Sequence, residues 1–312
     1  MPNDQAHRIY QHPAHALHQP PAGHAESPQR WHSIAQAISD LKQDHLSIHE
    51  SPMAKDADIH SLHPQPYWQD LKQREPNPDT APIQLDPDTW LSYGSIEASA
   101  RAAGAVLAGL EHTWHSQGKV FCAARPPGHH AGLASPMGFC LINPIAIGAH
   151  HAIHQYGAQR VAIVDFDVHH GNGTQDIFVN NPQVLYASSH QSPLYPGTGH
   201  ADETGVGNII NRPLEAGTGS AQFRAVWSED ILPRIAEFKP EILFISAGFD
   251  AHKDDPLAQL ALETDDYRWI AQQLSQFANQ HCQGRSLAMS EGGYDLTALT
   301  QSVIAFTQGY LS

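Results

Sequence analysis

The sequence predicts an α/β fold, organised as a single three-layer α/β/α domain around a central, mostly parallel sheet. Apolar runs that begin at Ile163, Ile242 and Ser286 each stop abruptly at polar or glycine-rich residues, as buried parallel strands do at their carboxyl ends. The motifs that follow these runs must converge on one site although they are spread from residue 23 to residue 294. One domain over residues 1–312 is therefore favoured over two smaller ones.

Helical segments are expected between the strands, because parallel strands need crossover connections. Residues 95–110 are rich in alanine, with Ser95 as the expected cap and Glu97 in the first turn. Three further helices are expected at 144–154, 221–238 and 265–281.

The run that begins at Ile163 ends in ligand-type side chains. Side chains alternate along an extended strand, so Asp165, Asp167 and His169 would project to one side and could converge on a cation. Asp250 ends the next run, and parallel strands place their carboxyl ends at one edge of the sheet. Catalytic zinc usually has three protein ligands and one open position, which Asp167, His169 and Asp250 would provide. Ferrous iron is the alternative metal, because carboxylates and imidazoles suit both ions.

Adjacent histidines follow a rigid proline-proline-glycine turn, at His129 and His130. Such a pair is weakly specific by itself, because most histidines are solvated or satisfied in the core. Beside a metal it has a clear use: a base must take a proton from water, and a departing amine needs an acid.

With these segments the chain resembles the zinc-dependent histone deacetylases and their bacterial relatives, the histone-deacetylase-like and acetylpolyamine amidohydrolases. Seven segments match in the family's order, at 23–30, 125–131, 138–143, 165–173, 195–199, 246–256 and 291–294. Their forms are similar to the class II branch, since Asn172 stands where class I carries an aspartate. The resemblance implies the arginase/deacetylase fold, with zinc held by Asp167, His169 and Asp250.

The resemblance also implies roles for the residues around the metal. His129 and His130 match the tandem histidines, oriented by Asp165 and Asn172 respectively, and Tyr294 matches the tyrosine that hydrogen-bonds the substrate carbonyl. Because Asn172 is neutral, His130 should be held less strongly as an imidazolium than it would be opposite an aspartate, which favours it as the base. Whether His130 also acts as the acid, or shares that role with His129, is left open.

Four residues match the family's substrate tunnel. Phe139 and Tyr195 would form its walls, the backbone carbonyl of Gly138 would receive the substrate amide hydrogen, and Leu257 would lie at the rim. The apolar Leu257, where polyamine-selective relatives can carry an acid, favours an acyl-lysine peptide or protein over an acetylated polyamine. A structural potassium ion is also implied, bound by Asp165, Asp167, His169, Ser188 and the backbone of Ser189.

The predicted function is zinc-dependent hydrolysis of an N-acyl (acetyl) amide on a lysine side chain or a similar amine, releasing a carboxylate. An acetylpolyamine amidohydrolase with the same site chemistry is the first alternative. An arginase-like binuclear manganese hydrolase would need an Asp-x-His-x-Asp run, which the Asp-Phe-Asp-Val-His-His segment at 165–170 lacks. A non-catalytic acyl-lysine binder would be expected to have lost the tyrosine or a ligand.

Composition bounds the partners. The formal charge of −15 argues against binding to nucleic-acid phosphates. No run approaches the roughly 20 apolar residues that span a bilayer, so no membrane segment is expected. The first eight residues lack the apolar core of a secretory signal, and a cytoplasmic location is expected by default. Three unpatterned cysteines, Cys122, Cys140 and Cys282, should be reduced and buried.

Histidine is concentrated near the N-terminus, with ten of the 23 between His7 and His63. Without a regular ligand spacing, these are expected in surface loops and short helices. The proline-rich stretch 60–87 should be a long ordered loop at the active-site rim or an oligomer contact, so a homo-oligomer stays open. Asp86 or Asp88 could supply a rim aspartate that binds substrate backbone, but Asp88 is also a candidate helix cap, and both are left outside the predicted site.

Overall fold

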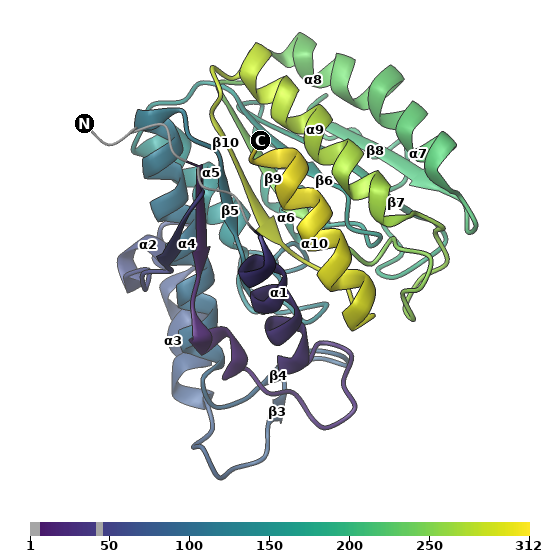
Figure 1. Ribbon diagram of the computed structural model, residues 1–312. Helices are drawn as coiled ribbons and strands as arrows, with labels where there is room; N and C mark the ends of the chain where they lie inside the picture. Colours follow the sequence, from purple (N-terminus) through teal and green to yellow (C-terminus); the bar gives the residue numbers. More distant parts are fainter. Residues whose placement is uncertain (1–6, 42–45) are drawn as a thin grey trace.

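The computed structural model describes residues 7–41 and 46–312, in which eight strands form one sheet with every neighbouring pair parallel (Figure 1). The strand order is β2-β1-β5-β10-β9-β6-β7-β8, and a separate antiparallel pair is formed by β3 (Ile83–Gln84) and β4 (Trp90–Leu91). The strands of the large sheet are β1 (His7–Gln11), β2 (Leu46–Glu50), β5 (Val120–Cys122), β6 (Val161–Asp165), β7 (Val184–Gln191), β8 (Ile209–Leu214), β9 (Ile242–Ala247) and β10 (Ser286–Ser290). The predicted α/β fold is confirmed.

Helices cover both faces of the sheet, which gives the three layers (Figure 1). One face is covered by η1 (Pro13–Ala16), α1 (Pro28–Asp40), α7 (Ser220–Ala225), the π-helical segment η2 (Val226–Ile231), α8 (Leu232–Phe238), α9 (Thr264–His281) and α10 (Leu296–Tyr310). The opposite face is covered by α4 (Ser95–Ser116), α5 (Pro144–His154) and α6 (Asn172–Phe178), with α2 (Asp56–His60) and α3 (Gln65–Arg74) packed outside α4. Two apolar cores therefore flank the sheet, and the strands between them are buried on both sides.

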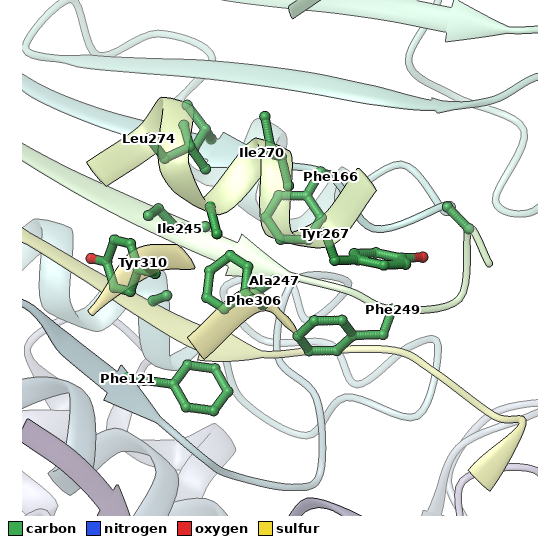
Figure 2. Packing of buried hydrophobic residues seen from close by; sticks show 14 of the residues in the cluster. Phe121, Phe166, Ile245, Ala247, Phe249, Tyr267, Ile270, Leu274, Phe306 and Tyr310 are labelled. Carbon is green, nitrogen blue, oxygen red and sulfur yellow. The ribbon is translucent and has the colours of Figure 1, made fainter. Parts of the chain in front are cut away.

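The core under α9 and α10 reaches the predicted metal ligands (Figure 2). Phe166, which lies between Asp165 and Asp167 in the chain, packs 6.3 Å from Tyr267 and 5.7 Å from Phe306, measured between ring centroids. Phe249 immediately precedes Asp250, and its ring lies 5.3 Å from that of Tyr267. Buried aromatic rings thus anchor the backbone on either side of the polar residues.

The predicted helices are found with adjusted ends. The helix predicted at 144–154 is α5, and that at 265–281 is α9, which begins one residue earlier. The helix at 95–110 is longer, Ser95–Ser116, and its cap is Gly94 in the left-handed conformation. Ser95 uses its hydroxyl elsewhere, bonded to the backbone of Ser92 and to His18. The segment 221–238 is divided into α7, η2 and α8.

Three expectations for the N-terminal part are wrong. The stretch 60–87 is not one loop, because α3 occupies its centre and buries Trp68 and Leu71 against α4. Asp88 starts no helix, since the short strand β4 follows it. The histidines of this part are not confined to the surface: His15 and His63 are fully buried. The many prolines and glutamines of this segment hid the apolar positions through which it packs onto the domain.

The three cysteines are free and buried, as expected. Within residues 7–41 and 46–312, no helix is both long and apolar enough to cross a membrane.

Candidate active site

The predicted site residues gather where β6, β9 and β10 end. β6 and β9 are neighbours with Asp165 paired to Ser246, and β9 and β10 are neighbours with Ala247 paired to Ser290. The loops that leave these three strands therefore emerge together at the carboxyl edge of the sheet, where α/β folds place their ligand sites. β6 itself ends at Asp165, so Asp167 and His169 lie in the loop beyond the strand and not on it.

Asp167, His169 and Asp250 converge, with one ligand atom of each within 4.8 Å of the others. His169 Nδ1 lies 3.2 Å from Asp167 Oδ1 and 3.0 Å from Asp250 Oδ2. Backbone amides hold the remaining carboxylate oxygens: Gly292 N donates to Asp167 Oδ2, and Val168 N donates to Asp250 Oδ1. These amides aim the free oxygens at the imidazole, so the three buried donors fit a divalent transition metal.

Glycines allow the backbone to approach these carboxylates. A Cβ atom on Gly248 would overlap Asp167 Oδ2, and one on Gly292 would overlap both Asp250 Oδ2 and Asp167 Oδ2. Any side chain at either position would push a carboxylate out of the cluster.

Burial and charge oppose one another in the cluster. Burial lowers the pKa of His169, but hydrogen bonds with Asp167 and Asp250 raise it to about 10. Burial and the neighbouring Asp167 raise the pKa of Asp250 to about 7. Two carboxylates in one buried site repel each other and favour a bound cation.

His129 is oriented by a carboxylate. Its Nδ1 donates to Asp165 Oδ2 over 3.0 Å, and the same oxygen accepts from the Tyr186 hydroxyl over 3.1 Å. Burial lowers the pKa of His129, but the charges of Asp167 and Asp165 raise it to about 10. His129 is therefore placed to carry a positive charge between the two aspartates.

His130 is oriented by an amide. Its Nδ1 donates to Asn172 Oδ1 over 2.8 Å, and its ring centroid lies 4.1 Å from that of His129. Burial lowers the pKa of His130 well below the ordinary histidine value, and the neighbouring His129 and His169 lower it further. The two tandem histidines thus differ in protonation, which is the direction that the neutral Asn172 predicts.

Glu291 binds the backbone of the loop that carries the tandem histidines. Its Oε2 accepts from the backbone amides of Gly128 (2.6 Å) and His129 (3.3 Å), and its Oε1 accepts from the Ser246 hydroxyl (3.0 Å). Burial raises the pKa of this carboxyl to about 7. One carboxylate therefore ties the histidine loop to the ends of β9 and β10.

Tyr294 lines the same pocket as His130 and His169, and two residues hold it in place. Its backbone amide donates to Asp255 Oδ2 over 2.7 Å, and the Arg30 guanidinium lies 4.9 Å from its ring centroid. Burial raises the pKa of its hydroxyl well above the ordinary tyrosine value. The hydroxyl therefore remains a hydrogen-bond donor at neutral pH.

A pocket of about 220 Å³ leads down to these residues. It is lined by Asp88, His130, Gly138, Phe139, His169, Leu194, Tyr195, Leu257 and Tyr294. All four predicted tunnel residues thus line one cavity, with aromatic walls and polar residues at its base. The Leu257 backbone is anchored by Asp255, the same carboxylate that holds Tyr294.

The wall residue Phe139 adopts φ = 69°, a conformation that costs a non-glycine residue about 1–3 kcal/mol. Its amide donates to the Thr89 hydroxyl, and the Gly138 amide donates to Asp88 Oδ1. A Cβ atom on Gly138 would overlap the His130 ring. This turn is therefore held by Asp88 and Thr89 directly against the base of the pocket.

The predicted potassium ligands include Asp167 and His169 of the metal cluster, together with residues of β6 and β7. Ser188 is paired with Asp165 across β6 and β7. Its hydroxyl lies 2.8 Å from His190 Nδ1, and the Ser189 hydroxyl accepts from Trp227 Nε1 over 2.9 Å. Ser188 is thus near Asp165, and the hydrogen bond of the Ser189 side chain leaves its backbone carbonyl as the predicted ligand.

Comparison with known proteins decides the family, because the histone deacetylase domain matches residues 24–310. The chain belongs to the histone deacetylase family. It is 34% identical over 286 residues to the histone deacetylase-like amidohydrolase of Pseudomonas aeruginosa, covering 88% of this chain and 74% of that protein. The crystal structure of the HDA15 HD domain superposes with a TM-score of 0.90 at 30% identity, covering 99% of this chain and 88% of that one.

Some relatives are much longer. The type-2 histone deacetylase 2 of Dictyostelium discoideum is 44% identical over 227 residues, which are 67% of this chain and 13% of that protein. The histone deacetylase domain, together with relatives named deacetylase and amidohydrolase, shows that the chain is a hydrolase.

Four residues that this deacetylase-family site uses were left outside the predicted site. Glu291 stands at a strand end like the predicted ligands, which was a usable signal. Asp255 and Asp88 lie in motifs or loops near predicted residues, but their hydrogen bonds to distant backbone amides leave no pattern in the sequence. Arg30 donates to the carbonyls of Gly293 and Glu291 from 260 residues away in the chain, and only the fold reveals it.

Proposed function

We propose that this deacetylase-family protein hydrolyses the acylated side chain of lysine with a single catalytic zinc. The observation that carries the proposal is the pocket: Phe139 and Tyr195 flank a narrow cavity whose base holds His130, His169 and Tyr294. An extended aliphatic stem fits between flat aromatic walls, and its terminal amide would reach the polar base.

Asp167, His169 and Asp250 would hold the metal, and the convergence of their donor atoms supports this. Zinc bound there would polarise the acyl carbonyl and make water a better nucleophile. Ferrous iron would suit the same ligands. A structural potassium ion near Asp165 and Ser188 remains part of the proposal, and a dependence of the melting temperature on potassium over sodium would test it.

His130 would act as the base. Asn172 accepts the hydrogen of His130 Nδ1, so Nε2 carries a lone pair, and the lowered pKa keeps the ring neutral. His129, held by Asp165 with a raised pKa, would stay protonated and supply positive charge beside the reaction. His130, once protonated, can return the proton to the departing amine.

Tyr294 would donate its hydroxyl hydrogen to the carbonyl oxygen as negative charge develops there. Its raised pKa keeps the proton on the tyrosine, and the contact strengthens in the transition state. Asp255 and Arg30 would keep the ring in place from behind.

One observation favours the second candidate, an acetylpolyamine amidohydrolase. Asp88 lines the same pocket, so a carboxylate is present at the wall although Leu257 is apolar. Two donors, the Gly138 amide and the Thr89 hydroxyl, already bind Asp88 Oδ1. We favour acyl-lysine because an extended polyamine carries further amines that the apolar walls would have to desolvate.

The test compares kcat/KM for an acetyl-lysine peptide with kcat/KM for N8-acetylspermidine and acetylputrescine. We expect the peptide to be preferred, and Leu257→Glu to shift the preference toward the polyamines. A tenfold preference of the unmodified enzyme for polyamines, about 1.4 kcal/mol, would overturn the acyl-lysine proposal. Loss of that preference in Asp88→Asn would then identify Asp88 as the acidic gate.

A further inference from the structure

The amide of Asn172 lies between two side chains. Its Oδ1 accepts from His130 Nδ1 over 2.8 Å, and its Nδ2 donates to the thioether sulfur of Met137 over 3.3 Å. Met137 belongs to the turn that carries Gly138 and Phe139. Its backbone is fixed there by paired hydrogen bonds with Cys140, of 3.1 and 2.9 Å.

An amide can bind either neutral tautomer of a histidine. With its oxygen toward the ring it accepts from Nδ1–H and leaves Nε2 with a lone pair. Rotated by 180°, its NH2 group donates to an unprotonated Nδ1, and the hydrogen then resides on Nε2. A carboxylate has no such ambiguity because it only accepts, so Asp165 always faces a protonated Nδ1 of His129.

The sulfur of Met137 removes the ambiguity at Asn172. A thioether accepts hydrogen bonds weakly and cannot donate, so it favours the NH2 group and disfavours the oxygen on its side. Water would make no such choice, because it can donate or accept. Both Asn172 and Met137 are partly exposed, so water would take the place of the sulfur if it were removed.

We infer that Met137 is a positioning residue that sets the orientation of the Asn172 amide and thereby keeps the hydrogen of His130 on Nδ1. The use of the free Nε2 as base rests on the proposed function, but the tautomer itself does not. Substrate never needs to touch Met137 for this effect.

The kinetic test is a double-mutant cycle of Met137→Leu and Asn172→Asp. Leucine keeps the apolar volume and lacks the acceptor, so Met137→Leu should lower kcat for an acetyl-lysine peptide by about two- to tenfold, the worth of one neutral hydrogen bond. In the Asn172→Asp background the carboxylate selects the tautomer by itself, so adding Met137→Leu should change kcat by less than about 1.5-fold. An equal loss in both backgrounds would show that Met137 acts by packing alone, and would overturn the inference.

A direct measurement separates this inference from the proposed function. Side-chain ¹⁵N chemical shifts of His130 in the zinc-loaded protein distinguish a protonated Nδ1 from a protonated Nε2 whatever the substrate is. We expect Nδ1–H in the unmodified protein and in Asn172→Asp with or without Met137→Leu, and a mixture of tautomers in Met137→Leu alone. Pure Nδ1–H in Met137→Leu alone, at equal zinc content, would refute the role of the sulfur.

Discussion

Two pairs of buried histidines in this protein have pKa values shifted in opposite directions. The scaffold histidines, His15 and His63, lie in the N-terminal part and face neutral backbone groups. His15 Nδ1 lies 2.6 Å from the Arg125 carbonyl, while His63 contacts the Leu133 carbonyl through Nδ1 and the Asn143 amide through Nε2. Burial lowers the pKa of His15 to about 3 and that of His63 to about 4.

The charged site histidines, His129 and His169, are as deeply buried but face carboxylates. Although burial lowers their pKa values, Asp167 with Asp165 raises that of His129 to about 10, and Asp167 with Asp250 does the same for His169. In these two pairs similar burial therefore gives opposite protonation, because each of the site histidines faces two carboxylates.

His130 shows the rule from within the active site. It stands beside His129 but faces the neutral Asn172, and its pKa is lowered like that of a scaffold histidine. The chain thus pairs a charged and a neutral imidazole by changing one orienting residue from an acid to an amide. That pairing suits a charge-stabilising group next to a base.

The largest expected effect comes from removing a carboxylate of the metal cluster. Asp250→Ala deletes one of three ligands, so we expect loss of bound zinc by metal analysis and activity at background level. Ala at the scaffold position, His63→Ala, should leave the zinc content unchanged. Full zinc occupancy and normal turnover in Asp250→Ala would contradict the ligand assignment.

Tyr294→Phe should have the next largest effect, and it separates chemistry from metal binding. The hydroxyl contact strengthens in the transition state, so kcat should fall by about a hundredfold or more. Zinc content and the melting temperature should stay close to those of the unmodified protein. An unchanged kcat would show that the hydroxyl does not serve the reaction.

Most of the fold was predictable because it follows periodicity and strand ends. The central strands β6, β9 and β10 correspond to the apolar runs before Asp165, at 242–247 and at 286–290. Because these neighbouring strands are parallel, the ligand motifs that follow them lie at one edge of the sheet. The N-terminal part was not predictable in the same way. Its histidines and prolines read as surface, yet His63 is buried because two backbone groups from distant segments meet there.

Within the site, predictability follows the kind of contact. Side chains that meet side chains, such as His129 with Asp165, were predicted through family motifs, and the structure brings them together. Side chains that hold distant backbone, such as Glu291 beneath Gly128, were not, because any residue can supply a backbone amide. The sequence at the amide end therefore carries no signal.

A smaller effect is expected when the scaffold histidine His63 is replaced, and it concerns stability. His63→Ala leaves the Leu133 carbonyl and the Asn143 amide without their buried partner, so the free energy of unfolding in urea should fall by about 2–3 kcal/mol. The kcat of the folded fraction should be unchanged. The exposed His32 is a matched control, and His32→Ala should stay within about 0.5 kcal/mol of the unmodified protein.

The smallest expected effect is on the pH dependence of stability, and it follows from the sign of the His63 shift. Its pKa is 6.5 when unfolded and about 4 when folded, so between these values the unfolded chain binds more protons and acid favours unfolding. The loss of stability caused by His63 is nearly absent above pH 7 and grows as the pH falls, to about 1.8 kcal/mol at pH 5. Urea unfolding at pH 7 and pH 5 should therefore show that the difference in free energy of unfolding between the unmodified protein and His63→Ala is about 1.8 kcal/mol smaller at pH 5. A constant difference would mean that the pKa of His63 is the same in the folded and unfolded states, and a widening difference would place it with His129 and His169.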